Sequence, residues 1–473
     1  MLVSMLRICP RWLGVVGLVA FAVLSASCFS GDDSEATPDP TPVPFPELTP
    51  FAADVAARLH AIRDGASEVR ELPLFVESSD GTVSREALQA YIDAFYENLT
   101  DEERREAAAA NVVLRMLGLI DQDDDVVDLF RQSLGEGIAG LYFDDEDKLV
   151  LIGDGRNLFP GHETTLAHEY IHSLQDGFFD FGRFDRLLET ENEDPETTTE
   201  YDVTLDCVRE GDATFGSFLW ARQEFGEEWA DVVFPDEGEA PPQENDYPEA
   251  LSRYGAFNYN ECVSFAAALY GEGGWDAVNE AYFRPPTSTE QVLHAGKYLA
   301  GERATRLPAP DDVSRTLGDG WERLDLDVFG EFDVFNYVAT LLDDEDAGTE
   351  VAAGWGAGWI AVYRHRADDD EATPSPEVAA GEDVLLHITL EWDSQADYTE
   401  FDEAFRRIAS AMSGGTARGD DVRVLCWSTE TEHAFYLGEP NGGHNHLIIT
   451  TNRAARDAAL TQRIEGRLFG CPA

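Results

Sequence analysis

The segment HEYIH, residues 168–172, constrains the fold of this chain more than any other. Histidines four residues apart lie about one turn apart on the same face of an α-helix. The apolar residues around them continue the helical spacing and form a separate stripe: Leu166, Tyr170, Ile171 and Leu174. We therefore expect a buried helix whose two histidines face inward, with Gly177 near its C-terminal end.

The spacing of His168 and His172 suits metal binding, because two imidazoles one turn apart can bind one zinc ion at about 2.0–2.1 Å each. Glu169 follows the first histidine, where a carboxylate can hold and deprotonate a metal-bound water. The alternative is a pair of solvated histidines without a metal. A catalytic zinc also needs a third protein ligand and one open coordination position.

The third ligand is expected on a second helix, predicted over about residues 200–224. The chain does not match the metzincin pattern HExxHxxGxxH, because Gln175 and Phe178 stand where that pattern needs glycine and histidine. The gluzincin pattern takes a glutamate from a following helix, and Glu210 fits it. Asp206 and Asp212 are rival ligands.

Asp206 and Asp212 are also our candidates for orienting the second nitrogen of a ligand histidine. Gly211, which has no side chain, would let this helix pack closely against the histidine helix.

Three segments, HEYIHSLQDGFFDF, VREGDAT and PPTSTEQVLHAGKY, resemble a prokaryotic group of secreted or lipoprotein gluzincin-like HExxH zinc metallopeptidases. The resemblance covers roughly residues 135–300. It implies His168, His172 and Glu210 as zinc ligands and Glu169 as the general base. The chain departs from the pattern at Ala295, where proline is expected.

A zinc hydrolase also needs a hydrogen-bond donor for the oxyanion of its tetrahedral intermediate. His294 and Tyr298 are the candidates, since they lie one turn apart if their segment is helical. The alternative for both residues is a role in packing or capping.

The N-terminus carries an export signal. Residues 1–27 combine two arginines with the apolar run 13–24, which is too short for a confident membrane span. The segment resembles a bacterial lipoprotein signal peptide, which predicts lipidation of Cys28. Residues 28–50 are rich in Pro, Asp and Thr and read as an extended tether. An ordinary signal peptide is the alternative, and both interpretations place the protein outside the cytoplasm, anchored by lipid or secreted.

Four cysteines follow the predicted tether: Cys207, Cys262, Cys426 and Cys471. No two of them have CxxC spacing, and in an exported protein we expect them to form disulfides. Of the three possible pairings we favour Cys207–Cys262 with Cys426–Cys471, because each bond then closes a loop within one region.

The formal charge of −60, from 93 acidic and 33 basic residues, argues against nucleic acid as a partner. The same charge repels anionic membrane surfaces, so the lipid anchor is the only expected membrane contact.

The predicted fold is α+β. Residues 51–305 are expected to form a mainly helical, zincin-like catalytic domain with a small β-sheet, including a hairpin over 137–155. Residues 306–473 are expected to form a C-terminal α+β region.

The function predicted from the sequence is that of an exported, lipid-anchored zinc metallopeptidase acting on a peptide or protein substrate. One alternative is a non-catalytic surface lipoprotein that contains zinc. The other is a zinc hydrolase with a non-peptide substrate.

Overall fold

The structure is a computed structural model. It describes residues 43–74, 79–137, 140–143, 148–153, 158–181, 198–234, 247–305, 307–366, 378, 382–419, 423–439 and 443–459. The predicted signal peptide, Cys28 and Cys471 lie outside the described residues. Within them, no helix has both the length and the apolar character needed to cross a membrane.

The first part of the chain is mainly helical, as expected. Four helices open it: α1 (Ala53–Arg70), α2 (Arg85–Glu97), α3 (Asp101–Met116) and α4 (Val126–Gly137). Ser84 caps α2 by accepting a hydrogen bond from the Ala87 amide. Thr100 and Glu103 cap α3 reciprocally.

A three-stranded sheet packs against these helices in the order β1-β3-β2. The predicted hairpin is present as β2 (Gly140–Phe143) and β3 (Lys148–Ile152), which pair antiparallel. The parallel partner of β3 is β1 (Ser79–Val83), a strand that was not expected. β2 therefore lies at one edge of the sheet, against the histidine helix.

The histidine helix is α5 (Pro160–Phe179). All four residues of the predicted apolar stripe are buried, which confirms the expected orientation. The helix ends at Phe179, two residues past Gly177, and Asp180 after it adopts the left-handed conformation with φ 55°. Gly177 thus lies near the C-terminal end, as expected, but is not the last residue.

The second predicted helix is α7 (Thr198–Phe225), which packs against α5 and against α9 (Glu249–Phe283). A disulfide between Cys207 and Cys262 joins α7 to α9 and confirms the first predicted pairing. Gly211 does allow a close approach, but to α9: a Cβ there would lie 2.2 Å from the Cys262 carbonyl oxygen. The expectation that Gly211 packs on the histidine helix was wrong.

The backbone of α9 leaves helical geometry at Gly273 and Gly274, and helical turns then resume. Short helices follow α7 and α9 in the chain. After α7 come η2 (Gly226–Glu228) and α8 (Trp229–Val233), and after α9 come α10 (Thr289–Leu293), α11 (Ala295–Ala300) and α12 (Ser314–Leu317).

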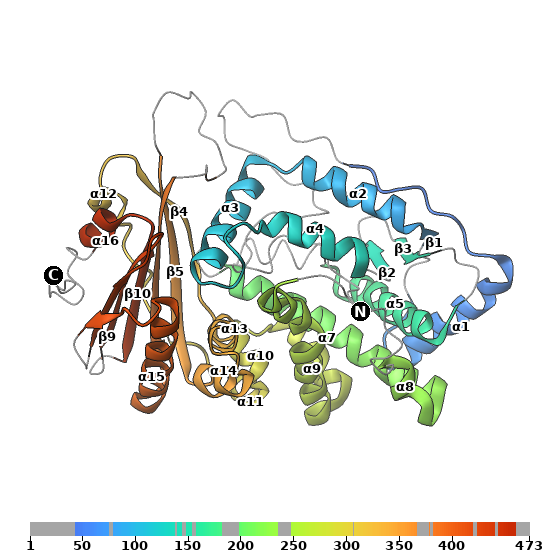
Figure 1. The fold of residues 1–473 in the computed structure, drawn as a ribbon. Coiled ribbons are helices and arrows are strands. Elements are labelled where there is room, and N and C mark those ends of the chain that lie inside the picture. The colour runs from blue at the N-terminus through green and yellow to red at the C-terminus, as the bar shows by residue number, and fades with distance from the viewer. Residues whose placement is uncertain are drawn as a thin grey trace, which may run out of the picture.

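The C-terminal part is built on a seven-stranded antiparallel sheet in the order β4-β5-β6-β10-β9-β8-β7 (Figure 1). In chain order its strands are β4 (Trp321–Val328), β5 (Trp355–His365), β6 (Asp383–Trp392), β7 (Arg418–Gly419), β8 (Val424–Ser428), β9 (His433–Glu439) and β10 (His444–Thr450). One face packs against α13 (Glu331–Leu342), α14 (Glu345–Ala352) and α15 (Gln395–Met412). The other face packs against α12 and α16 (Arg453–Ala459).

The chain is thus a mixed α and β protein, with a small sheet among helices and a large antiparallel sheet after them. A single hydrophobic cluster joins the two parts, because it contains Leu88 and Val113 from early helices together with Ile388 and Phe405 from the sheet part. The two regions on either side of the predicted boundary at residue 305 therefore share one core, and their division into two domains stays a prediction.

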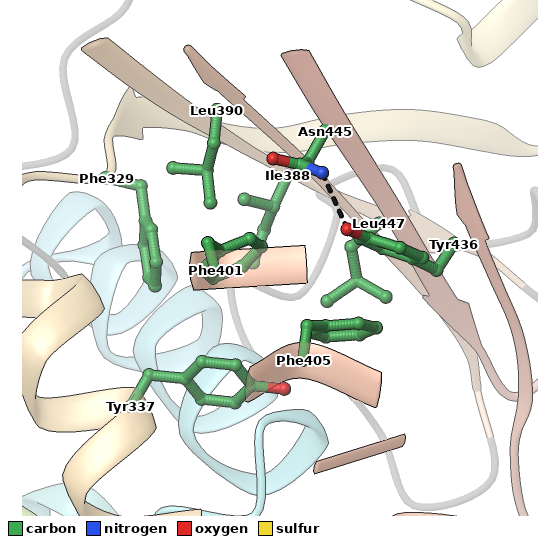
Figure 2. Close-up of a pocket in the computed structure, with 9 residues that line it drawn as sticks. All are labelled: Phe329, Tyr337, Ile388, Leu390, Phe401, Phe405, Tyr436, Asn445 and Leu447. Carbon is green, nitrogen blue, oxygen red and sulfur yellow. Dashed lines mark hydrogen bonds between the residues drawn. The ribbon is translucent and has the colours of Figure 1, made fainter. Parts of the chain in front are cut away.

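A small cavity lies between the sheet and α15 (Figure 2). All of its lining side chains are buried, and all but one are apolar or aromatic: Phe329, Tyr337, Ile388, Leu390, Phe401, Phe405, Tyr436, Asn445 and Leu447. The lining carries no ionisable carboxylate or imidazole, so we interpret the cavity as a packing defect of the core.

Candidate metal centre

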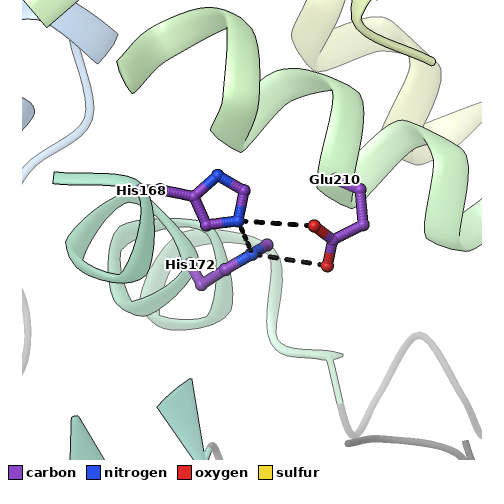
Figure 3. A group of neighbouring side chains, drawn as sticks. All are labelled: His168, His172 and Glu210. Atoms are coloured by element: carbon purple, nitrogen blue, oxygen red, sulfur yellow. Dashed lines mark hydrogen bonds and ion pairs between the residues drawn. The ribbon is translucent and has the colours of Figure 1, made fainter. Parts of the chain in front are cut away.

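Three ligand-type side chains converge where α5 and α7 pack together (Figure 3). The Nε2 atoms of His168 and His172 lie 2.9 Å apart. The carboxylate of Glu210 lies 3.3 Å from Nε2 of His168 and 3.4 Å from Nε2 of His172. Each of the three residues is 5% exposed. The structure therefore brings together all three residues that the sequence nominated as ligands.

The hydrogen bonds of Gln175 determine which nitrogen of His172 carries the proton. The Gln175 Nε2 atom donates to the Arg209 carbonyl at 3.1 Å and to Asp212 at 3.0 Å, and both of these groups can only accept. The Gln175 Oε1 atom, 2.9 Å from Nδ1 of His172, must then accept a proton from that nitrogen. The lone pair of His172 is therefore on Nε2, facing His168 and Glu210.

On the other side of the cluster, Nδ1 of His168 lies 3.4 Å from the Thr214 hydroxyl. Burial, and the neighbouring His172, lower the pKa of His168 and favour its neutral form. Tyr259 of α9 places its ring 6.5 Å from the His168 ring, centroid to centroid.

The donor set fits a cation. A single proton can form a hydrogen bond between only two of the three groups, whereas a metal ion at their centre can bind all three. Ligands about 2.0–2.1 Å from a tetrahedral zinc are about 3.3–3.4 Å apart. The two contacts of Glu210 match this separation, whereas the two histidine nitrogens lie closer together, at 2.9 Å. Burial tends to raise the pKa of Glu210, but His172 and His168 outweigh it and lower this pKa to about 2. Glu210 is therefore an anion, as a zinc ligand requires.

Glu169 is the fourth buried group of the site, and it is fully enclosed. Burial, followed by the charge of Glu210, raises the pKa of Glu169 well above its usual value, while the backbone N–H of Tyr142 acts in the opposite direction. Neither carboxylate oxygen makes a well-formed hydrogen bond within the part of the chain that the structure describes. Strand β2 covers it, since a Cβ on Gly140 would lie 3.5 Å from the Glu169 Cγ atom.

The predicted orienting residues differ in what they contact. Asp212 reaches His172 through Gln175, and Asp206 lies 3.6 Å from the Arg209 guanidinium. Gln175 was missed as an orienting group, although its position three residues after His172 puts it on the same face of the helix.

The two predicted oxyanion donors make contacts elsewhere. His294 lies between α10 and α11 in non-helical geometry, with its Nε2 atom 2.7 Å from Glu331. Tyr298 donates to the Arg284 carbonyl at 2.8 Å and packs on Phe265. Neither contact involves a member of the histidine cluster.

A second acidic group, Glu290, Glu302 and Asp393, has its carboxylates close enough to share a metal. The Lys297 ammonium already lies 2.5 Å from Glu290, 2.9 Å from Asp393 and 3.7 Å from Glu302. A cation supplied by the chain thus already occupies this group.

Comparison with known proteins adds one family match. Residues 316–458 match a family described as a domain of unknown function (DUF8575). The match covers the large antiparallel sheet and its helices, and it does not include the histidine cluster. No curated protein and no solved structure matches the chain.

Proposed function

We propose that this protein is a zinc-dependent hydrolase, and specifically a metallopeptidase of the gluzincin type. A lipid anchor would hold it outside the cytoplasm. The observation that carries the proposal is the convergence of two imidazole nitrogens and the Glu210 carboxylate within 3.4 Å of one another in a buried site. The adjacent Glu169 supports catalysis over a purely structural metal, because a structural site needs no general base.

His168, His172 and Glu210 would hold the zinc, which when bound polarises a carbonyl group and makes a water acidic. Glu169 would take the proton from that water and deliver it to the leaving amine. Its oxygens suit this role, since no well-formed hydrogen bond from a described residue occupies them. Burial excludes bulk water and strengthens every electrostatic interaction in the site.

The first test is the metal content of the purified protein by mass spectrometry. We expect one zinc per chain, and loss of that zinc in Glu210→Ala. Glu302→Ala is the matched control, because it removes a carboxylate from the acidic group that the Lys297 ammonium already occupies. An unchanged zinc content in Glu210→Ala would rule out the three-ligand site. A wild-type protein without zinc, even after zinc is supplied, would rule out the function.

A further inference from the structure

A chain of buried hydrogen bonds leads to the metal site from Arg70, the last residue of α1. The Arg70 side chain is fully buried. Its Nε and Nη2 atoms donate to the two oxygens of Asp212 at 2.5 and 3.0 Å, and Nη2 also donates to Asn279 at 2.6 Å. The guanidinium lies over the Trp275 ring, 4.3 Å from its centroid. Arg70 is thus held from several sides and has little freedom to move.

Asp212 of α7 is the centre of this network. Besides Arg70, it accepts hydrogen bonds from the Tyr282 hydroxyl at 2.7 Å and from the Gln175 amide at 3.0 Å. Four donors therefore fix both of its oxygens. An acceptor held in this way forces the amide nitrogen of Gln175 toward α7 and leaves the amide oxygen toward His172.

We infer that Arg70, Asp212 and Gln175 act together as positioning residues that hold His172 in the tautomer able to bind a metal. The inference rests on the proposed zinc site. Gln175 accepts the Nδ1 proton of His172, so the Nε2 lone pair points at His168 and Glu210. In the other tautomer, Nε2 carries the proton and cannot bind a metal. Partners of this kind typically change metal affinity by about 10- to 100-fold.

The network brings a helix outside the HExxH segment into the metal site. Arg70 and Asp212 are 142 positions apart in the chain, so α1 is a structural part of the site. Removing the acceptor at Gln175 should release His172 to populate both tautomers and to rotate, without removing any metal ligand.

The test compares two buried amides. In Gln175→Leu we expect the zinc dissociation constant, measured by competition with a chromophoric chelator, to rise about 10- to 100-fold. Asn445→Leu is the matched control, because Asn445 is also buried and hydrogen-bonded but lies in the sheet region. We expect both variants to lower the melting temperature, but only Gln175→Leu to weaken zinc binding.

A charge-relocating pair provides the rescue. In the double variant Gln175→Glu with Asp212→Asn, residue 175 still accepts from His172, the Oδ1 atom of residue 212 still accepts from Nε of Arg70, and the new amide can donate to residue 175. The contacts of Nη2 of Arg70 with Oδ2 and of residue 175 with the Arg209 carbonyl are lost, so we expect zinc affinity to recover only in part, to a value above that of Gln175→Leu. Imidazole ¹⁵N shifts of the zinc-free protein, assigned with His172→Gln, should show the Nδ1–H tautomer in wild type and a mixture in Gln175→Leu.

The outcomes separate this inference from the proposed function. If the wild type binds one zinc through Glu210 and Gln175→Leu binds it equally tightly, the positioning role is wrong and the zinc site stands. If Asn445→Leu weakens zinc binding as much as Gln175→Leu, the effect is general destabilisation and the inference is overturned. If the wild type binds no zinc, both proposals fail.

Discussion

Two buried polar networks can be compared, one around His172 in the helical region and one around Asn445 in the sheet region. In the sheet region each contact joins a donor to an acceptor. Trp392 donates to Asn445 at 2.6 Å, Asn445 donates to the Tyr436 hydroxyl at 2.6 Å, and Tyr436 donates to Asp402 at 2.7 Å. Such a network is satisfied by the protein alone.

The helical region satisfies its outer contacts in the same way but leaves an inner set of acceptors facing one another. Arg70, Asp212 and Gln175 end at Nδ1 of His172. Beyond that ring, Nε2 faces a second imidazole and a carboxylate. The difference shows which kind of interior suits a binding site: two imidazoles and a carboxylate that converge could hold a cation, whereas the apolar cavity beside Asn445 offers no such ligands.

The strongest test of this contrast is Glu169→Gln. We expect hydrolysis of a peptide substrate to fall by roughly 10²- to 10⁴-fold, because the general base is lost, while the zinc content stays unchanged. Stability should hold, since Glu169 makes no well-formed hydrogen bond to a described residue. Asp402→Asn is the counterpart in the sheet region and should cost about 1–3 kcal/mol of stability without affecting turnover. Full turnover in Glu169→Gln would contradict the mechanism.

The next largest effect is expected from the disulfide of the helical region. The bond between Cys207 and Cys262 spans 55 residues, and Cys207 lies one turn before Glu210. Replacing both cysteines by serine should lower the free energy of unfolding by about 4 kcal/mol, measured by urea denaturation. Zinc affinity should also fall, because α7 is then less firmly held beside α9. A variant as stable as wild type would show that α7 and α9 need no covalent link.

Leu447→Ala probes the sheet region alone. Leu447 is buried and lines the cavity, so truncation enlarges a void and should cost about 2–5 kcal/mol of stability. The zinc content should stay at the wild-type value, since no metal ligand belongs to that region. Loss of zinc from a folded Leu447→Ala protein would mean that the two interiors are coupled through their shared core.

The smallest effect is expected where the two regions meet, at Glu200. This α7 residue accepts hydrogen bonds from the backbone and hydroxyl of Thr289, and it lies so close to Gly330 that a Cβ there would be 2.4 Å from its oxygen. Burial, and then the charge of Asp333, raise the pKa of Glu200 to about 8.

The raised pKa of Glu200 sets the direction of a pH effect. The folded protein keeps the proton that the unfolded chain releases near its ordinary pKa of 4.5. The contribution of Glu200 to the free energy of unfolding is therefore complete below about pH 4.5. It declines as the pH rises toward 8, by about 2 kcal/mol between pH 5 and 7. Glu200→Gln should flatten this decline in thermal unfolding measured across that range. An equally steep decline in the variant would assign the effect to other groups.

Local patterns predicted most elements near the site. Helical spacing located α5 and α7, and the hairpin was expected over 137–155. The C-terminal part was expected to contain both helices and strands, without its strand order. Strand β1, the parallel partner of β3, was not among the expected elements.

The sequence by itself nominated His168, His172 and Glu210 as the candidate ligands. The helical period places His168 and His172 one turn apart whatever surrounds them, and Glu210 follows on the next predicted helix. Only the tertiary structure decided what orients them. Gln175, Asp212 and Arg70 meet across three helices, and Gly211 faces α9 and not α5. Such contacts depend on how helices far apart in the chain pack, whereas spacing within one helix depends only on its own geometry.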